Sequence, residues 1–92
     1  MRVVVAYDIS SDRRRKKVSD LLGNVLTRVQ LSVFEGDLPP EVLERWVEKA
    51  VRLLDTETDS LRVYHLCAAC APRVDVYGFG ILLDDDLPVR IL

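Results

Sequence analysis

The segment Arg2–Tyr7 restricts the folds open to this chain more than any other feature. It is an almost uninterrupted apolar run that includes three consecutive valines. Such a run is typical of a strand covered on both faces, as in the middle of a sheet. The polar segment Ser10–Asp12 follows at once, and its residue types are favoured at the N-cap of a helix. We therefore predict a central strand that leads into a helix ending near Leu22, where Gly23 suits the C-terminal cap.

The remaining chain predicts a second helix and further strands. Polar and apolar residues alternate over residues 28–35, 61–66 and 74–78, which is typical of strands. After the first of these, Pro40 suits the first turn of a helix. Apolar residues recur at helical spacing from Leu43 to Leu54, so this helix is expected to bury one face.

This order of elements predicts an α+β fold in which two helices cover one face of a small sheet. A ferredoxin-like βαββαβ sandwich requires two strands between the helices, whereas the alternation shows one stretch. A bend or turn near Gly36 would supply the break, which the pattern alone does not place. With 92 residues there is room for one core. We assign residues 1–78 to that domain and residues 79–92 to a C-terminal tail.

Hydrophobic residues make up 49% of the chain, which is a large share for so small a domain. A short chain buries only about 60–65% of its unfolded surface. A second copy of the chain is therefore expected to cover part of the remaining apolar surface. The apolar tail could cross to that partner subunit. The N-terminal apolar run is far shorter than the ~20 residues that span a bilayer. We expect a cytoplasmic homodimer with no membrane segment.

Charge is distributed unevenly along the chain. The net charge of −2 argues against a nucleic-acid partner when it is taken alone. Residues 1–34, however, hold seven Lys and Arg against three Asp, whereas residues 35–92 hold six against twelve acidic residues. Because an approaching polyanion responds to the local field, the N-terminal third is a candidate surface for DNA or RNA.

Asp8 is the first candidate for chemistry, because it ends the predicted central strand just before a helix. Its carboxylate should emerge at the rim of the sheet. Mg²⁺ commonly takes one or two carboxylates together with water and phosphate oxygens. One aspartate makes a poor site, but two copies related by a two-fold axis would make a plausible one. The alternative interpretation is an aspartate that only caps the following turn.

The second candidate is a run of five consecutive cations on the first helix: Arg13, Arg14, Arg15, Lys16 and Lys17. Successive residues turn by about 100° around a helix, so several of these side chains are expected to project near Asp8. Dense positive charge near a helix N-terminus is unfavourable, and a polyanion would relieve it. The alternative is a solvated cationic face with Asp12 and Asp20 as partial partners.

Three residues could support this surface. Arg28 could add a phosphate contact. Phe34 could pack at a subunit interface, stack on a base or fill the core. Tyr7 could position a phosphate or water through its hydroxyl, or could be a half-buried strand residue.

Other reactive residues predict less. Cys67 and Cys70 supply only half a zinc site, and with His65 they need not converge as a nucleophilic system. We interpret them as two small thiols after a strand, while a disulfide and a zinc ion shared between chains stay open. We interpret Asp84–Asp86 as an acidic turn rather than a metal cluster.

Two segments together, Val3–Ser10 and Arg28–Leu38, strongly resemble the CRISPR-associated protein 2 family. Asp59–Tyr64 and Val74–Gly78 are similar to that family's fourth and fifth strands, so the resemblance covers roughly residues 1–78. It implies a ferredoxin-like fold and a homodimer. It also implies a role in CRISPR spacer acquisition, an antiviral defence, beside the family's integrase.

The resemblance further implies a metal-dependent endonuclease that acts on RNA or double-stranded DNA, with Mg²⁺ or Mn²⁺ as cofactor. The family's functional positions fall on Tyr7, the metal-binding Asp8, Arg15, Lys17, Arg28 and Phe34. Leu31 stands where many members carry Tyr, so no hydroxyl role is expected there.

Three hypotheses follow. The first is that the chain is a phosphodiesterase with Asp8 as the catalytic residue. The second is that it is a non-catalytic scaffold that holds DNA for the integrase. As a third, it is a regulatory module that binds a small ligand and lacks salt-dependent affinity for DNA.

Overall fold

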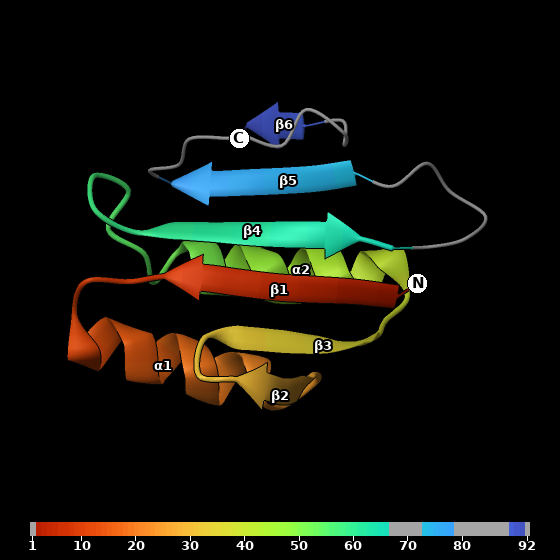
Figure 1. Cartoon of the computed structure of the whole chain (residues 1–92), viewed down its shortest axis with the longest axis horizontal. Coiled ribbons are helices and arrows are strands. Elements are labelled where there is room, and N and C mark those ends of the chain that lie inside the picture. The colour runs from red at the N-terminus through yellow and green to blue at the C-terminus, as the bar shows by residue number, and fades with distance from the viewer. Residues whose placement is uncertain (1, 67–72, 79–88, 92) are drawn as a thin grey trace.

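The computed structural model describes residues 2–66, 73–78 and 89–91, and their strands form one sheet with the order β2-β3-β1-β4-β5-β6 (Figure 1). The elements are β1 (Arg2–Asp8), α1 (Asp12–Leu22), β2 (Thr27–Gln30), β3 (Val33–Asp37), α2 (Pro40–Val51), β4 (Ser60–His65), β5 (Arg73–Gly78) and β6 (Val89–Ile91).

The first strand is central, as its apolar run predicts. β1 lies between β3 and β4 and is antiparallel to both. β2 pairs with β3, and β5 pairs with β4, again antiparallel. β6 adds a parallel strand next to β5. The elements from β1 to β4 follow the βαββαβ order, so the predicted ferredoxin-like α+β fold with an extra C-terminal strand is confirmed.

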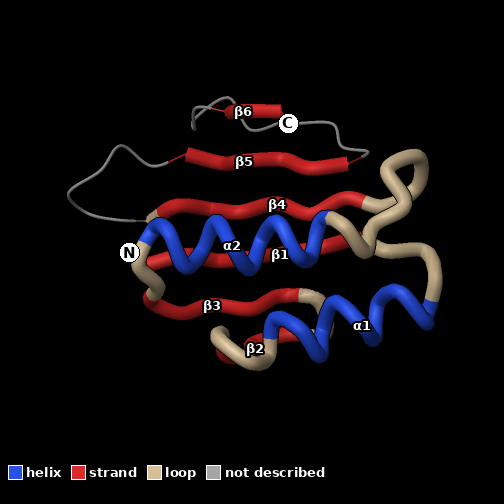
Figure 2. The backbone as a smooth tube through the Cα atoms, turned by 180° about the vertical axis from the view of Figure 1, so that it is seen from behind, coloured by secondary structure: helices blue, strands red, loops and turns tan. Residues whose placement is uncertain are grey.

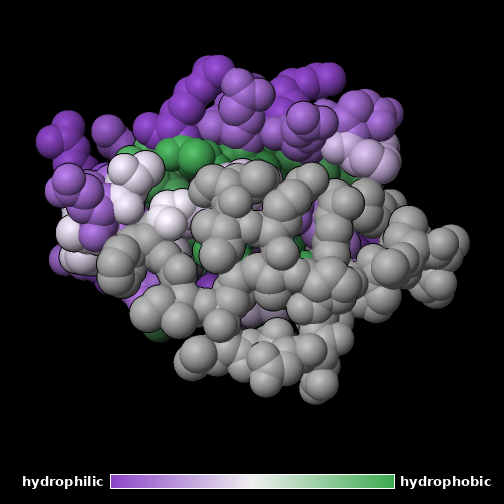
Figure 3. Space-filling view, turned by 90° about the horizontal axis from the view of Figure 1, so that it is seen from above, coloured by the Kyte–Doolittle hydropathy of each residue, from purple (hydrophilic) through white to green (hydrophobic). Residues whose placement is uncertain are grey.

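α1 and α2 both cover the same face of the sheet (Figure 2). Alternate residues of β1 point to that face and are buried, namely Val3, Val5 and Tyr7. The helices supply the facing apolar side chains, among them Val18, Leu22, Leu43, Val47 and Ala50. Burying a valine or leucine side chain contributes about 1.5–3 kcal/mol. Seen from above, hydrophilic residues cover the outer side of the helical layer, and hydrophobic residues lie beneath them (Figure 3).

The opposite face of β1 carries Val4, Ala6 and Asp8. Asp8 is exposed and the other two are half-buried. No described helix covers this face (Figure 2). β1 thus turns one apolar face to the core, while Val4, Ala6 and the Asp8 carboxylate lie on the other face. The expectation that the apolar run is covered on both faces is therefore not met within the described residues.

The break between the two middle strands lies at residues 31–32, not near Gly36 as the sequence suggested. β2 ends at Gln30 and β3 begins at Val33, and the register shifts between Arg28 and Gln30. A two-residue connection alone would reverse the alternation, since it pairs Gln30 with Val33. The one-residue register shift restores it, so that Arg28 pairs with Phe34 and the pattern continues through the turn. Gly36 lies inside β3, where a Cβ would come within 3.0 Å of the Leu26 Cδ2 atom.

The remaining elements agree with the sequence apart from small shifts. Ser11 caps α1 by accepting a hydrogen bond from the Arg14 backbone N–H. α2 ends at Val51 rather than Leu54, because the last residues form turns instead. None of the described helices is long and apolar enough to cross a bilayer.

Several interpretations fall on residues outside the described ranges. These include the cysteine pair Cys67 and Cys70, the acidic turn Asp84–Asp86 and most of the tail from residue 79. Within the tail, only the backbone of β6 is described. The crossing of the tail to a partner subunit therefore stays a prediction.

Candidate nucleic-acid and metal site at the end of β1

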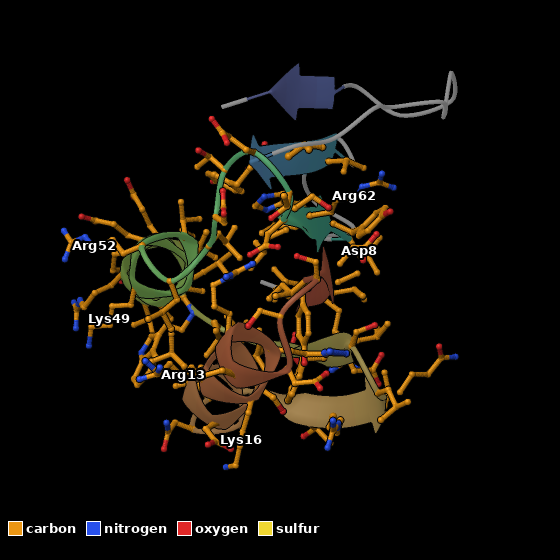
Figure 4. The ribbon with its side chains drawn as sticks, turned by 90° about the vertical axis from the view of Figure 1, so that its left-hand side faces the viewer. Asp8, Arg13, Lys16, Lys49, Arg52 and Arg62 are labelled. Carbon is orange, nitrogen blue, oxygen red and sulfur yellow. The ribbon has the colours of Figure 1, made fainter. Side chains whose placement is uncertain are left out.

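Asp8 is the last residue of β1 and lies opposite Ser60, the first residue of β4. Its side chain is exposed on the side of the sheet away from α1 and α2 (Figure 4). The following residue, Ile9, is buried in the core, so the chain is anchored directly after the carboxylate. An exposed carboxylate on a rigid strand end is accessible to a cation or to water.

A buried carboxylate lies close to this strand end. Asp59 is fully buried, and its Oδ2 atom accepts hydrogen bonds from the Arg14 Nε atom at 2.7 Å and the Asp55 backbone N–H at 2.9 Å. Its Oδ1 atom accepts from the Ser10 backbone N–H at 3.1 Å and from the Thr58 hydroxyl at 3.0 Å.

These bonds keep Asp59 ionised. The hydrogen bond from Arg14 is the main cause that holds the pKa of Asp59 well below its usual range, against the opposing effect of burial. The same contact raises the pKa of Arg14. The pair therefore stays charged at neutral pH and ties the start of α1 to the loop that precedes β4.

The five cations of α1 have different environments. Arg14 is engaged by Asp59. Arg15 pairs with Asp12, and Lys16 pairs with Asp20 at 2.8 Å. These two pairs are the ones that the solvated-face interpretation expected.

The side chains of Arg13 and Lys17 are exposed and make no hydrogen bond or ion pair within the described part of the chain. Figure 4 places Arg13 and Lys16 with the helical layer, whereas Asp8 lies on the other side of the sheet. α1 nevertheless begins at the end of the sheet where β1 ends (Figure 1). The helix cations and Asp8 therefore share one end of the molecule but not one face.

Tyr7, Arg28 and Phe34 meet around the turn between β2 and β3. The Arg28 Nη2 atom donates to the Leu31 carbonyl oxygen at 2.9 Å, and the Tyr7 hydroxyl donates to the same oxygen at 3.3 Å. The rings of Tyr7 and Phe34 stack with centroids 6.2 Å apart. Both aromatic residues are buried, so each belongs to the core, while Arg28 is exposed and its guanidinium holds the turn.

Sequence reasoning missed two residues near Asp8. Arg62 lies opposite Ala6 in the register and on the same side as Asp8 (Figure 4). The alternation of residues 61–66 predicts the strand that carries Arg62. Only the pairing of that strand with β1 shows that Arg62 and Asp8 lie on the same face of the sheet. The sequence places Asp59 in a polar loop and gives no sign of its role. Two of its partners, Arg14 and Ser10, lie 45 and 49 residues away in the sequence.

Asp8 fits a hard divalent cation as one ligand of a site rather than as a whole site. The described residues contain no group of three or more His, Cys, Asp or Glu that could hold a metal ion. Mg²⁺ nevertheless needs only one or two carboxylates when water and phosphate oxygens complete its shell. The second carboxylate would have to come from another copy of the chain.

The fold and this strand end define a ferredoxin-like α+β protein with an exposed acidic residue at the end of its central strand. Within that class, the chain belongs to the family described as CRISPR associated protein Cas2, whose model matches residues 1–74. The resemblance noted in the sequence is thereby confirmed.

Two curated relatives support the assignment. The CRISPR-associated endoribonuclease Cas2 1 of Chloroflexus aurantiacus is 42% identical over 81 residues, which are 87% of each chain. The CRISPR-associated endonuclease Cas2 2 of Thermus thermophilus is 47% identical, over 85% of this chain and 82% of the relative.

Solved structures agree. A hypothetical protein from Thermus thermophilus superposes with a TM-score of 0.68 at 46% identity, covering 73% of this chain and 82% of that chain. Streptococcus pyogenes Cas2, crystallised at pH 6.5, gives a TM-score of 0.67 at 32% identity, covering 73% of this chain and 87% of that chain.

Proposed function

We propose that this chain acts in CRISPR spacer acquisition beside the integrase subunit, as a homodimer that cleaves phosphodiester bonds in RNA or DNA. The observation that carries the proposal is the exposed Asp8 at the rigid end of β1. Family membership supports it, because the relatives described above are named endoribonuclease and endonuclease.

Two Asp8 carboxylates related by a two-fold axis would bind one Mg²⁺ or Mn²⁺ ion. When bound, such an ion lowers the pKa of its water and offsets negative charge at phosphorus. The chain's own residues hold the substrate. Arg62 adds a cation on the Asp8 side of the sheet. On the helix side, Arg13 and Lys17 bind the phosphate backbone, and no carboxylate of the described residues competes for their side chains. Such contacts carry no base readout, so weak sequence preference is expected.

The decisive comparison uses purified wild type and Asp8→Asn with RNA and duplex DNA, in Mg²⁺, in Mn²⁺ and with chelator. The asparagine is nearly isosteric but is a much weaker ligand for a hard cation, so we expect cleavage to be abolished while the dimer stays folded. Cleavage by Asp8→Asn at the wild-type rate, or wild-type cleavage that withstands chelator, would refute the catalytic role.

A non-catalytic scaffold is the second candidate function. It is favoured by the position of the helix cations, which lie on the side of the sheet away from Asp8 (Figure 4) and so would hold DNA independently of it. Unchanged spacer acquisition by Asp8→Asn in cells would support the scaffold. A matched loss of acquisition and of cleavage would favour catalysis.

A further inference from the structure

The Asp59 carboxylate is a buried charged group that the proposed function does not use. It receives donors from three separate segments: the β1–α1 connection through Ser10, helix α1 through Arg14, and the α2–β4 loop through Asp55 and Thr58. A buried charge is costly unless it is fully paired. Its donors come from the segments that meet where β1 ends, so the carboxylate helps to set the geometry of that end of the sheet.

The chain around Asp8 is tied at two successive points. Asp8 itself lies opposite Ser60 in the antiparallel register. Two residues further on, the Ser10 backbone N–H donates to Asp59, which directly precedes Ser60. Segments 8–10 and 59–60 are thus joined at two points: Asp8 lies opposite Ser60, and Ser10 is hydrogen-bonded to Asp59.

Asp59 is itself held from two directions. Arg14 contacts both of its carboxylate oxygens, with the Nη2–Oδ1 distance at 3.3 Å. On the backbone side, Gly78 approaches so closely that a Cβ there would lie 2.3 Å from the Asp59 carbonyl oxygen. The residue that holds the β1–α1 connection therefore has little freedom of its own.

We propose that Asp59, fixed by Arg14, is the positioning residue of the Asp8 site: it sets the path of the chain through Ser10, so that Asp8 projects its carboxylate from the end of β1 in one orientation. The inference rests on the proposed role of Asp8 as a metal ligand. Supporting residues around metal ligands commonly change affinity by 10–100-fold when they are replaced.

The test compares the full-length chain with Asp59→Asn and Arg14→Lys. The first keeps the shape of residue 59 but loses its charge, and the second keeps the charge of residue 14 but loses the two-pronged contact. Asp20→Asn is the matched control, because it breaks an exposed ion pair on the same helix. Val47→Ala, at a buried site on α2, lowers stability but removes none of the hydrogen bonds to Asp59.

Two signals are recorded by NMR below the melting temperature of every variant. The first is the side-chain χ1 coupling of Asp8, which is large or small for one rotamer and intermediate for an average of rotamers. The second is the Mn²⁺ concentration that half-broadens the amide signals of residues 8 and 60. Activity is not needed for either signal.

We expect Asp59→Asn and Arg14→Lys to average the Asp8 coupling and to raise the half-broadening Mn²⁺ concentration about tenfold. Asp20→Asn and Val47→Ala should match wild type in both signals, even where Val47→Ala melts at a lower temperature. A wild-type Asp8 coupling in folded Asp59→Asn would overturn the inference, as would averaging of equal size in Val47→Ala.

The two proposals fail separately. If Mn²⁺ broadens no amide near Asp8 in wild type, the metal role of Asp8 fails, and the Asp8 coupling still decides whether Asp59 positions it. If Mn²⁺ binds wild type and Asp59→Asn equally well, the metal role stands and the positioning role is refuted.

Discussion

At the scale of single residues, the main finding is that adjacent cations on one helix have different roles. Arg14, which is half-buried, pairs with the fully buried Asp59, whereas Arg13 beside it is exposed. Charge in the sequence is therefore a poor guide to what is available for a ligand. The deciding factor is whether a carboxylate distant in the sequence lies within reach of the side chain.

The Asp59 carboxylate should make stability depend on acid. Its pKa in the folded chain is depressed, chiefly by Arg14, relative to about 3.9 in an unfolded chain. Its contribution is thus complete above about pH 4 and is lost as the pH falls further towards the folded-state value. Urea titrations between pH 7 and about pH 2.5 should show that the free energy of unfolding falls with decreasing pH. The fall should be shallower in Asp59→Asn, by up to about 1.4 kcal/mol per pH unit. Parallel curves for wild type and variant would contradict this.

Gly78 should not tolerate a side chain. Its φ of 81° is in the left-handed region, and a Cβ would lie 2.3 Å from the Asp59 carbonyl oxygen. Backbone atoms yield little, so Gly78→Ala should lower the free energy of unfolding by roughly 1–3 kcal/mol. Chemical denaturation measures the change. Gly23→Ala is the control, because Gly23 has an ordinary φ of −63°, and it should cost clearly less.

At the scale of elements, the β2–β3 hairpin shows how far alternation can mislead. Leu31 is 82% exposed and Val29 is 47% exposed, although both continue the apolar positions of residues 28–35. On the far side of the turn, Phe34 is 2% exposed and packs on Tyr7. One continuous pattern thus covers an exposed edge strand and a core strand.

Substitutions on the two sides of this turn should differ sharply in cost. Leu31→Ala removes an exposed side chain and should change the free energy of unfolding by about 0.5 kcal/mol or less. Phe34→Ala leaves a cavity in the core and should cost about 3–5 kcal/mol. Denaturation at several protein concentrations also tests whether a second copy covers Leu31, since its loss would then weaken the dimer. Equal costs in dilute monomer would be inconsistent with the turn at residues 31–32.

At the scale of the whole molecule, the sheet separates two charged surfaces. Asp8 and Arg62 lie on one side, and Arg13 and Lys16 lie on the side of the helices (Figure 4). A nucleic acid that reaches both sides has to pass around the end where β1 stops and α1 begins (Figure 1). Affinity and cleavage should therefore be separable by mutation.

The dependence of binding on salt should identify the phosphate contacts. Each lost contact should lower the slope of log affinity against log salt concentration by about one, per chain that touches the duplex. We expect this for Arg13→Ala and Lys17→Ala and not for Asp8→Asn. Fluorescence anisotropy with a labelled duplex measures the slope. Slopes that match wild type in both cation variants would show that the helix side does not contact DNA.

The sequence by itself determined the local features of this protein. The apolar run of β1, the cap at Ser11, the proline that opens α2 and the alternation of β4 each act within a few residues. Hydrophobic period and cap chemistry are local properties, so the α+β class, the central first strand and the rim position of Asp8 could be predicted.

The tertiary structure alone decided which side chains meet. The turn at residues 31–32, the pairing of Arg14 with Asp59 and the shared face of Asp8 and Arg62 all depend on strand register and helix placement. Register fixes contacts between residues far apart in the chain, and no local pattern encodes the distance that separates them. For that reason the candidate aspartate was visible in the sequence, while the groups that hold it in place were not.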